Sequence, residues 1–414
     1  MTNKTQIIIA GAGPVGCVVG LILARAGISV TILETENDLI PELRASTFHP
    51  PTLDMLDELG VTPKLIDQGL ITPKIQYRDL EDGLVAEFDH ALINDRTKHP
   101  YRLQCEQFKL TRIIAEMLKE FPHAEISFDS KFVNASQTDN AVRVFYVTPA
   151  GSKQVTCDYL IGADGSRSEV RKSQKIEFQG FTYPEQFVTV SVPEDVDKIV
   201  PGMGHVCYIA HPTQWCALIH APDYWRFLFP IPMETTKEEA FDDDFLEGRL
   251  QHLAPHQERY AIQLRTLYGV NQRVAETYRL GRILLAGDSA HVNNPLGGMG
   301  MNVKGLFGKR FKRAHVVKCK SCEHQFWGKT KIRYSECPNC EAKCLIVNPS
   351  EISIKERERM WRFLNDDDME TSAELNHDEF MEESFQDMDY EGHWGDTPHA
   401  CAHEMAEKVR EDLR

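Results

Sequence analysis

The chain has 414 residues, which is long enough for about two or three domains that each bury a core. Hydrophobic residues make up 42% and charged residues 26%, as in globular proteins rather than disordered or collagen-like chains. No apolar run reaches the length of a membrane span, and the glycine-interrupted stretch 7–24 lacks the basic flank of a signal peptide. We therefore expect a cytoplasmic protein with no membrane span.

The net charge of −16 is unevenly distributed. Residues 1–302 contain 28 basic and 39 acidic residues, residues 303–343 contain 11 and 3, and residues 345–414 contain 7 and 20. Of the 11 cysteines, five are scattered before residue 302 and five others fall between Cys319 and Cys344. Scattered cysteines indicate free thiols in a reducing compartment, whereas clustered ones indicate a metal. The pattern predicts a change of module near residue 303.

The N-terminal residues have the order of a dinucleotide-binding unit. Thr5–Ala10 is a short β-branched apolar run, which predicts a buried parallel strand. A Gly-x-Gly-x-x-Gly sequence follows at Gly11–Gly16, then helix-favouring residues at Cys17–Ala26. Ser29–Glu34 predicts a second strand that ends in a carboxylate. These elements predict a strand, glycine loop, helix and strand that bind a dinucleotide, either FAD or NAD.

Each glycine of this loop has a separate physical task. Gly11 permits a tight turn, Gly13 lets the backbone approach a pyrophosphate, and Gly16 allows close packing of helix and strand. The free N–H groups at the start of the helix bind phosphate. Glu34, 18 residues after Gly16, is placed to accept hydrogen bonds from ribose hydroxyls.

Two later blocks repeat the pattern of a strand that ends in an acid. Residues 157–171 contain a strand that leads into Asp164-Gly165 and a basic helix start. Residues 281–291 contain a strand that leads into Gly287-Asp288, followed by a glycine-rich loop at Asn294–Asn302. Acids at the carboxyl ends of strands in an α/β sheet lie where ligands bind.

These blocks, in this order, closely resemble the FAD-dependent aromatic hydroxylases of the para-hydroxybenzoate hydroxylase and phenol hydroxylase type. The resemblance covers residues 5–302 and includes the segments 44–60 and 104–110. It implies an α/β fold with a Rossmann-like FAD-binding domain and an inserted antiparallel β-sheet substrate domain. The implied boundaries are residues 1–175 and 279–302 for the FAD-binding domain and 176–278 for the substrate sheet.

The resemblance also implies which residues hold FAD. It assigns Arg44 to the pyrophosphate, Gln107 to the ribityl chain, Asp288 to the ribityl–phosphate region, and Asp164 with Gly165 to FAD and transient NAD(P)H binding. The residues that hold the ADP half are Gly11, Gly13, Gly16 and Glu34. The residues of the loop beside the isoalloxazine ring are Pro295, Gly297, Gly298, Met301 and Asn302.

The implied reaction is hydroxylation of a phenolic or other aromatic small molecule with NAD(P)H and O₂, through a hydroperoxide at flavin C4a. Such chemistry belongs to the cofactor, while the protein orients the reactants and excludes water. No catalytic side chain is assigned, although Pro295 is expected near the flavin ring.

The region between the two acid-bearing blocks alternates apolar and polar residues, which predicts an antiparallel sheet. Strands are expected at residues 186–192, 205–210, 214–220 and 225–229. The aromatic side chains that either line a substrate cavity or pack the sheet are Tyr183, Trp215, Tyr224, Trp225 and Tyr268.

After residue 302 the resemblance stops. The family continues into a long helix, but residues 303–315 here carry two glycines within four positions, which disfavours a helix by roughly 1 kcal/mol each relative to alanine. An alternative is therefore a truncated, catalytically impaired flavoprotein fused to a nucleic-acid- or protein-binding module.

That module is predicted at residues 303–345. Two Cys-x-x-Cys pairs separated by fourteen residues resemble a zinc ribbon, in which four thiolates hold a structural Zn²⁺. The expected ligands are Cys319, Cys322, Cys337 and Cys340, with a strand at residues 330–335 between the pairs. A redox dithiol is the alternative, and nucleic-acid contact through the basic flanks is considered but not favoured. Residues 346–414 are expected to be an acidic, partly disordered tail.

Overall fold

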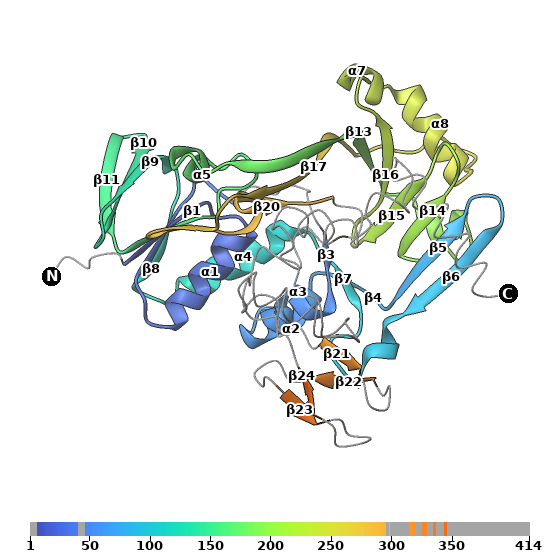
Figure 1. Cartoon of the computed structure of the whole chain (residues 1–414). Coiled ribbons are helices and arrows are strands. Elements are labelled where there is room, and N and C mark those ends of the chain that lie inside the picture. The colour runs from blue at the N-terminus through green and yellow to red at the C-terminus, as the bar shows by residue number, and fades with distance from the viewer. Residues whose placement is uncertain are drawn as a thin grey trace, which may run out of the picture. The chain divides into compact units, whose positions relative to one another are not determined.

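The computed structural model describes residues 6–39, 46–294 and 298, together with the backbone of four short later strands. The described elements fall into two compact units, one containing β1 to β20 and the other β21 to β24 (Figure 1). Each unit is described by itself.

The first sheet consists of five parallel strands and one antiparallel edge strand, in the order β18-β19-β12-β1-β2-β8. Its strands are β1 (Ile7–Ala10), β2 (Val30–Leu33), β8 (Ala124–Ser127), β12 (Tyr159–Gly162), β18 (Arg279–Leu280) and β19 (Ile283–Leu285). All four residues of β2 and the last three of β1 are buried, as expected for parallel strands covered on both faces.

Different layers cover the two faces of this sheet. Ile9 and Ile32 point to the helix α1 (Pro14–Arg25), because a Cβ at Gly20 of that helix would meet both side chains. Helix α4 (Gln107–Leu118) lies beside α1 (Figure 1). On the other face, Ile8 joins a core that includes a three-stranded antiparallel sheet. That sheet consists of β9 (Lys131–Gln137), β10 (Val142–Thr148) and β11 (Gly151–Cys157).

A second large sheet has eight strands in the order β20-β17-β13-β16-β15-β14-β5-β6. Its strands are β5 (Lys74–Asp79), β6 (Gly83–Asp89), β13 (Phe178–Val192), β14 (Val206–Ala210), β15 (Cys216–Ala221), β16 (Tyr224–Pro232), β17 (Leu264–Ala275) and β20 (His291–Val292). Strands are present in each of the four segments that the sequence predicts. The hairpin β5–β6 joins from outside the predicted range 176–278, and β14 pairs with β5 in parallel.

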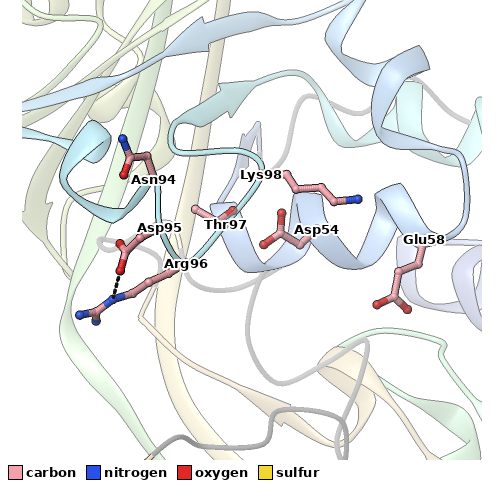
Figure 2. Close-up of a pocket in the computed structure, with 7 residues that line it drawn as sticks. All are labelled: Asp54, Glu58, Asn94, Asp95, Arg96, Thr97 and Lys98. Atoms are coloured by element: carbon pink, nitrogen blue, oxygen red, sulfur yellow. Dashed lines mark ion pairs between the residues drawn. The ribbon is translucent and has the colours of Figure 1, made fainter. Parts of the chain in front are cut away.

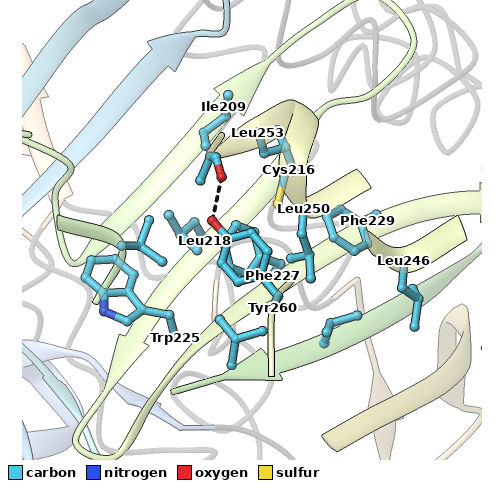
Figure 3. Close-up of a cluster of buried hydrophobic side chains, with 14 of the residues drawn as sticks. Ile209, Cys216, Leu218, Trp225, Phe227, Phe229, Leu246, Leu250, Leu253 and Tyr260 are labelled. Atoms are coloured by element: carbon cyan, nitrogen blue, oxygen red, sulfur yellow. Dashed lines mark hydrogen bonds between the residues drawn. The ribbon is translucent and has the colours of Figure 1, made fainter. Parts of the chain in front are cut away.

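One face of the eight-stranded sheet is covered by two helices, α7 (Lys237–Ala240) and α8 (Asp243–Leu253). Trp225 lies in this core together with Phe227 of the same strand and Leu250 of α8 (Figure 3). The Tyr260 hydroxyl donates to the carbonyl of Ala254, which closes one end of the cluster. Trp225 therefore packs against helices rather than toward the face described next.

The opposite face carries aromatic side chains from the alternate positions of the same strands. Phe187, Trp215 and Tyr268 are neighbours, with ring centroids 5.6 Å apart for Phe187 and Trp215 and 6.0 Å for Phe187 and Tyr268. Tyr183 packs against the same cluster. Because successive strand residues point to opposite faces, Tyr224 lies on this face and its neighbour Trp225 on the helix-covered one. We call this the aromatic face.

Smaller elements complete the first unit. A three-stranded sheet has the order β3-β7-β4, with β3 (Thr47–Phe48), β4 (Leu70–Thr72) and β7 (Arg102–Gln104). The remaining helices and 3₁₀ turns are α2 (Pro50–Glu58), α3 (Thr62–Ile66), η1 (His90–Ile93), α5 (Glu169–Ser173), α6 (Val196–Ile199) and η2 (Gly287–Ser289). No helix in the described part of the chain is both long and apolar enough to cross a membrane.

The second unit consists of two antiparallel hairpins. β21 (His315–Lys318) pairs with β22 (Gln325–Gly328), and β23 (Tyr334–Glu336) pairs with β24 (Lys343–Leu345). Strands β21 and β24 lie close together. The strand that the sequence predicts at residues 330–335 corresponds only to the start of β23, which begins at Tyr334. The predicted acidic tail at 346–414 lies outside the described residues.

We expect Leu250→Ala to lower the free energy of unfolding by about 2–5 kcal/mol, because the side chain is fully buried between α8 and the sheet. Leu92→Ala is the matched control, since Leu92 is 82% exposed, and should change it by less than about 0.5 kcal/mol. Equilibrium urea denaturation of both variants measures the difference. Equal losses would mean that the helix does not cover the sheet as described.

Candidate functional site

Four loops at the carboxyl edge of the first sheet carry the residues that the sequence predicts to bind a dinucleotide. The loops follow β19, β12, β1 and β2, which are consecutive neighbours in the sheet. They carry Asp288, Asp164, the glycines at 11–16 and Glu34, respectively. Parallel strands end at one edge, so the sheet brings together residues that are far apart in the sequence.

The glycine loop packs against the neighbouring loop with almost no space to spare. Gly11 has φ +99°, and a Cβ there would lie 2.6 Å from the carbonyl oxygen of Ala163. A Cβ at Gly16 would lie 1.9 Å from the carbonyl oxygen of Gly11. The predicted roles of these glycines as a tight turn and a close helix–strand contact match this geometry.

Gly13 differs from its neighbours because the space beside it is open. A Cβ at this position would meet no atom within 4 Å. Gly13 is the N-cap of α1 and has no side chain with which to cap the first N–H groups of that helix. A helix N-terminus with open space in front of it is a site for a phosphate or pyrophosphate.

Glu34 holds the glycine loop as well as facing the ligand edge. Its Oε2 accepts a hydrogen bond from the backbone N–H of Ala12 at 2.8 Å, and its Oε1 accepts one from Glu36 at 3.1 Å. A carboxylate oxygen can accept more than one hydrogen bond, so the group can also receive ribose hydroxyls. The carboxylate charge also adds to the burial that raises the pKa of the nearby Cys17 thiol.

The carboxyl group of Asp164 is partly buried at this edge. Burial raises the pKa of its carboxyl group, and hydrogen bonds from Ser168 and from backbone N–H groups offset part of the rise. Oδ2 accepts from the N–H of Val170 at 3.0 Å, while Oδ1 is buried and has no partner within the described residues. A buried acceptor without a donor fits a ligand hydroxyl, as the ribityl and ribose groups of FAD would supply.

The loop after β19 packs against the start of α1. Gly287 has φ +65°, and a Cβ there would lie 2.7 Å from Cγ2 of Val15. Asp288, which follows it, is exposed at the edge. Gly298 lies close to Thr47 and His49, within 3.6 Å of both if it carried a Cβ. Together with the free helix N-terminus and the two other acids, this donor and acceptor set fits FAD.

Arg171 and Ser289 connect two of these loops, and the sequence analysis gave neither a role. Arg171 is buried, and its guanidinium donates to the carbonyl oxygens of Ser166 at 2.8 Å and Ser289 at 2.9 Å. The same guanidinium lies 3.7 Å from the ring centroid of Phe178, at the start of β13. The only sequence signal was a basic residue seven positions after Asp164.

Other predicted residues are less informative. Gln107 is the half-buried first residue of α4. The residues that lie outside the described part of the chain are Arg44, Pro295, Gly297, Met301, Asn302, Cys319, Cys322, Cys337 and Cys340. Among the residues that are described, no group of three or more His, Cys, Asp or Glu side chains could hold a metal ion.

A separate hollow lies between α2 and the segment after η1 (Figure 2). Its lining residues are Asp54, Glu58, Asn94, Asp95, Arg96, Thr97 and Lys98. Most of these side chains are exposed, and the Asp95–Arg96 ion pair spans 3.7 Å at the surface. None of the predicted FAD-binding residues is among them, so we assign this hollow no role.

We expect Arg171→Met to lower the free energy of unfolding by about 1–3 kcal/mol, because the buried carbonyl of Ser289 and the partly buried carbonyl of Ser166 lose a charged donor. FAD affinity should fall as well, since the loops of Asp164 and Asp288 lose their connection. Arg167→Met is the control, because Arg167 is exposed on the same loop. Urea denaturation and fluorescence titration with FAD measure both effects, and equal behaviour of the two variants would contradict the role of Arg171.

Comparison with known proteins identifies the family of this chain. Residues 4–304 match a family described as FAD binding domain. The match ends beside residue 303, where the charge and the cysteine content change.

Two characterised relatives and one solved structure cover a similar share of the chain. It is 30% identical over 307 residues to para-nitrophenol 4-monooxygenase of Pseudomonas sp. (strain WBC-3), covering 73% of this chain and 75% of the relative. It is 33% identical over 308 residues to 6-hydroxy-3-succinoylpyridine 3-monooxygenase of Pseudomonas putida (strain DSM 28022 / S16), covering 73% and 76%. The crystal structure of p-nitrophenol 4-monooxygenase from Pseudomonas putida DLL-E4 has a TM-score of 0.68 at 30% identity, covering 72% and 76%.

The matched region contains every FAD-binding residue that the sequence predicts. Both relatives and the solved structure are monooxygenases, which confirms the prediction of an FAD-dependent monooxygenase. The chain belongs to the FAD-binding domain family of flavin-dependent enzymes.

Proposed function

We propose that the chain uses NAD(P)H and O₂ to hydroxylate a phenolic or other aromatic small molecule. One observation carries the proposal. The N-terminus of α1 at Gly13 and the buried oxygen Oδ1 of Asp164 lie at the same edge of the first sheet. The eight-stranded sheet of the same unit adds an aromatic face. The names of the relatives reported above refer to a nitrophenol and a hydroxypyridine, which supports a hydroxyl-bearing aromatic ring as substrate.

The residues of the chain divide the work between cofactor and substrate. FAD, when bound, supplies the redox chemistry that activates dioxygen. The N–H groups of α1 hold its pyrophosphate, and Asp164 accepts a hydroxyl of its chain. The apolar rings of Phe187, Trp215 and Tyr268 exclude water from the reacting ring. The role of the Asp164-Gly165 loop in binding NAD(P)H stays a prediction.

A reducing location is part of the proposal. The cysteines at positions 17, 105, 157, 207 and 216, in the described part of the first unit, are buried free thiols. Free thiols are typical of proteins kept in a reducing compartment. We therefore propose that the enzyme works in the cytoplasm.

Gly13→Val should abolish FAD binding while leaving the fold intact. The backbone at Gly13 is extended, with φ −66° and ψ 179°, and a Cβ meets no atom, so valine fits the protein itself. The added methyl groups would occupy the space proposed for the pyrophosphate. The visible absorbance spectrum of the purified full chain measures flavin content, and phenol-dependent NAD(P)H oxidation measures turnover.

Gly248→Ala is the matched control for this variant, because its Cβ also meets nothing and lies on α8, away from the proposed site. It should keep full flavin content. A Gly13→Val protein that stays yellow would refute the pyrophosphate site. A colourless wild type would favour the alternative of an impaired flavoprotein.

As a second function, we propose that residues 315–345 bind one structural Zn²⁺. The described strands form two hairpins, β21–β22 and β23–β24, and each is closed by a six-residue connection. The connections 319–324 and 337–342 each begin with Cys-x-x-Cys. Hairpin connections that each supply two thiolates are the arrangement of a four-cysteine zinc site. Nucleic-acid contact through the flanking basic residues is a weaker proposal, tested by salt-dependent binding.

Cys337→Ser should remove the zinc and leave the flavin content unchanged. Cys344→Ser is the control, because Cys344 lies in β24 rather than in a Cys-x-x-Cys pair. Metal analysis by plasma mass spectrometry and flavin absorbance on the same sample give both readings. Equal zinc in the two variants would contradict the four-cysteine site.

A further inference from the structure

The small sheet β3-β7-β4 has one polar face that neither the FAD site nor the sequence motifs account for. The central strand β7 pairs with β3 along one edge, where Gln104 lies opposite Thr47. It pairs with β4 along its other edge, where Arg102 lies opposite Thr72. Residues directly opposite in such a sheet point to the same face, and so do residues two apart on β7. The hydrogen bond from the Thr47 hydroxyl to Oε1 of Gln104, 2.8 Å long, confirms this arrangement.

Three polar atoms on this face are buried and lack partners in the described part of the chain. They are Nε2 of Gln104, Nε of Arg102 and Oγ1 of Thr72. Gln104 is fully buried and Thr72 is 1% exposed. Nearly all buried polar groups in proteins are hydrogen-bonded, so three such atoms on one face indicate that an acceptor from outside the described chain completes them.

The two ends of the polar face lie beside the regions that the proposed reaction uses. Thr47 is next to Gly298, in the loop expected beside the flavin ring. At the other end, the charge of Arg102 lies close enough to the Tyr77 hydroxyl to offset part of the rise that burial causes in its pKa. Tyr77 stacks on Tyr208 of the aromatic face, with ring centroids 5.2 Å apart. The polar face therefore lies near both the flavin loop and the aromatic side chains.

The hydrogen-bonding character of these three atoms indicates which kind of ligand they can bind. Arg102 offers a cationic N–H, Gln104 offers an amide N–H, and Thr72 offers a hydroxyl that can donate. A set of donors with one positive charge binds an oxygen acceptor that carries full or partial negative charge. We infer that Arg102, Gln104 and Thr72 bind an oxygen-bearing acceptor group of the aromatic substrate, such as a nitro, carboxylate or phenolate oxygen.

This inference rests on the proposed function, because it assigns a part of the substrate to a site beside the flavin. The carbonyl oxygens of the flavin ring have the same acceptor chemistry, so the test must separate the two ligands. Two dissociation constants do so, one for FAD and one for the substrate probe.

The experiment uses the full chain loaded with FAD and a pair of probes of similar size, 4-nitrophenol and 4-methylphenol. Equilibrium dialysis gives the dissociation constant of each probe, and fluorescence titration of the apoprotein gives that of FAD. The wild type should bind 4-nitrophenol at least ten-fold more tightly than 4-methylphenol. Arg102→Met and Gln104→Leu should each remove most of that preference without changing FAD affinity. Arg102→Lys should restore part of it, because the charge remains.

Gln76→Leu is the matched control, since Gln76 is also buried but has its side chain fully hydrogen-bonded to Glu87, Gly202 and Gly204. It should lower stability in urea and keep the probe preference. Gln104→Leu should also lose some stability, because the Thr47 hydroxyl loses its acceptor, but unlike Gln76→Leu it should remove the probe preference. The probe preference therefore separates a binding role from a structural one.

Each other outcome overturns the inference. A ten-fold loss of FAD affinity with an unchanged probe preference would assign the polar face to the flavin. Unchanged preference and unchanged FAD affinity would leave the face without a ligand role. A wild type that binds FAD but does not prefer 4-nitrophenol would refute the acceptor chemistry. Failure of the wild type to bind FAD would instead refute the proposed function, and it is seen before any probe is added.

Discussion

The close packing of three backbone loops at the carboxyl edge of the first sheet is the constraint on which the site depends. The loop at Gly11 touches the loop of Asp164, and Gly287 touches Val15 at the start of α1, so neither glycine can carry a side chain. This contact brings the acids of three strands to one edge and leaves the helix N-terminus free to face them. The buried guanidinium of Arg171 then fixes the spacing of two of the loops. Without this closeness, the acids would remain separate surface groups.

The eight-stranded sheet shows how alternation along a strand separates two tasks. Along β16, Trp225 and Phe227 point to the helix-covered core, while Arg226 and Leu228 point to the aromatic face. A one-residue shift of register would exchange the two sets. The core under α8 therefore fixes the register that presents the aromatic face to the rest of the unit. Stability and the proposed substrate contact depend on the same strands but on different side chains.

The parts of the site that sequence could predict are those whose chemistry is local. The glycines at 11–16 and the acid at Glu34 form a short motif, and the structure places them as expected. Arg171 could not be assigned, because its partner Ser289 is 118 residues away. The hairpin β5–β6 was missed for the same reason, since its pairing partner β14 lies more than a hundred residues further along the chain.

Some residues looked unremarkable in sequence because only pairing gives them meaning. Arg102 and Gln104 lie shortly before Gln107 in the sequence, and nothing local marks them as partners of Thr72 and Thr47. For the same reason, the sequence alone could not show on which face of the sheet each aromatic residue lies. Trp215, which directly precedes β15, and Trp225 of β16 are both buried, and only the three-dimensional packing shows that they belong to different clusters. Long-range pairing, rather than composition, decides which polar and aromatic side chains lie together.

The stability of the described strands after residue 304 has a different physical basis. These four described strands have three or four residues each and pair only as two-stranded hairpins. An isolated two-stranded hairpin of this length is marginally stable at best in water. Small units of this kind are stabilised by a disulfide or a metal. Two Cys-x-x-Cys pairs fall in the sequence between the paired strands, so the shortness of the strands as well as the cysteine spacing favours the proposed zinc site.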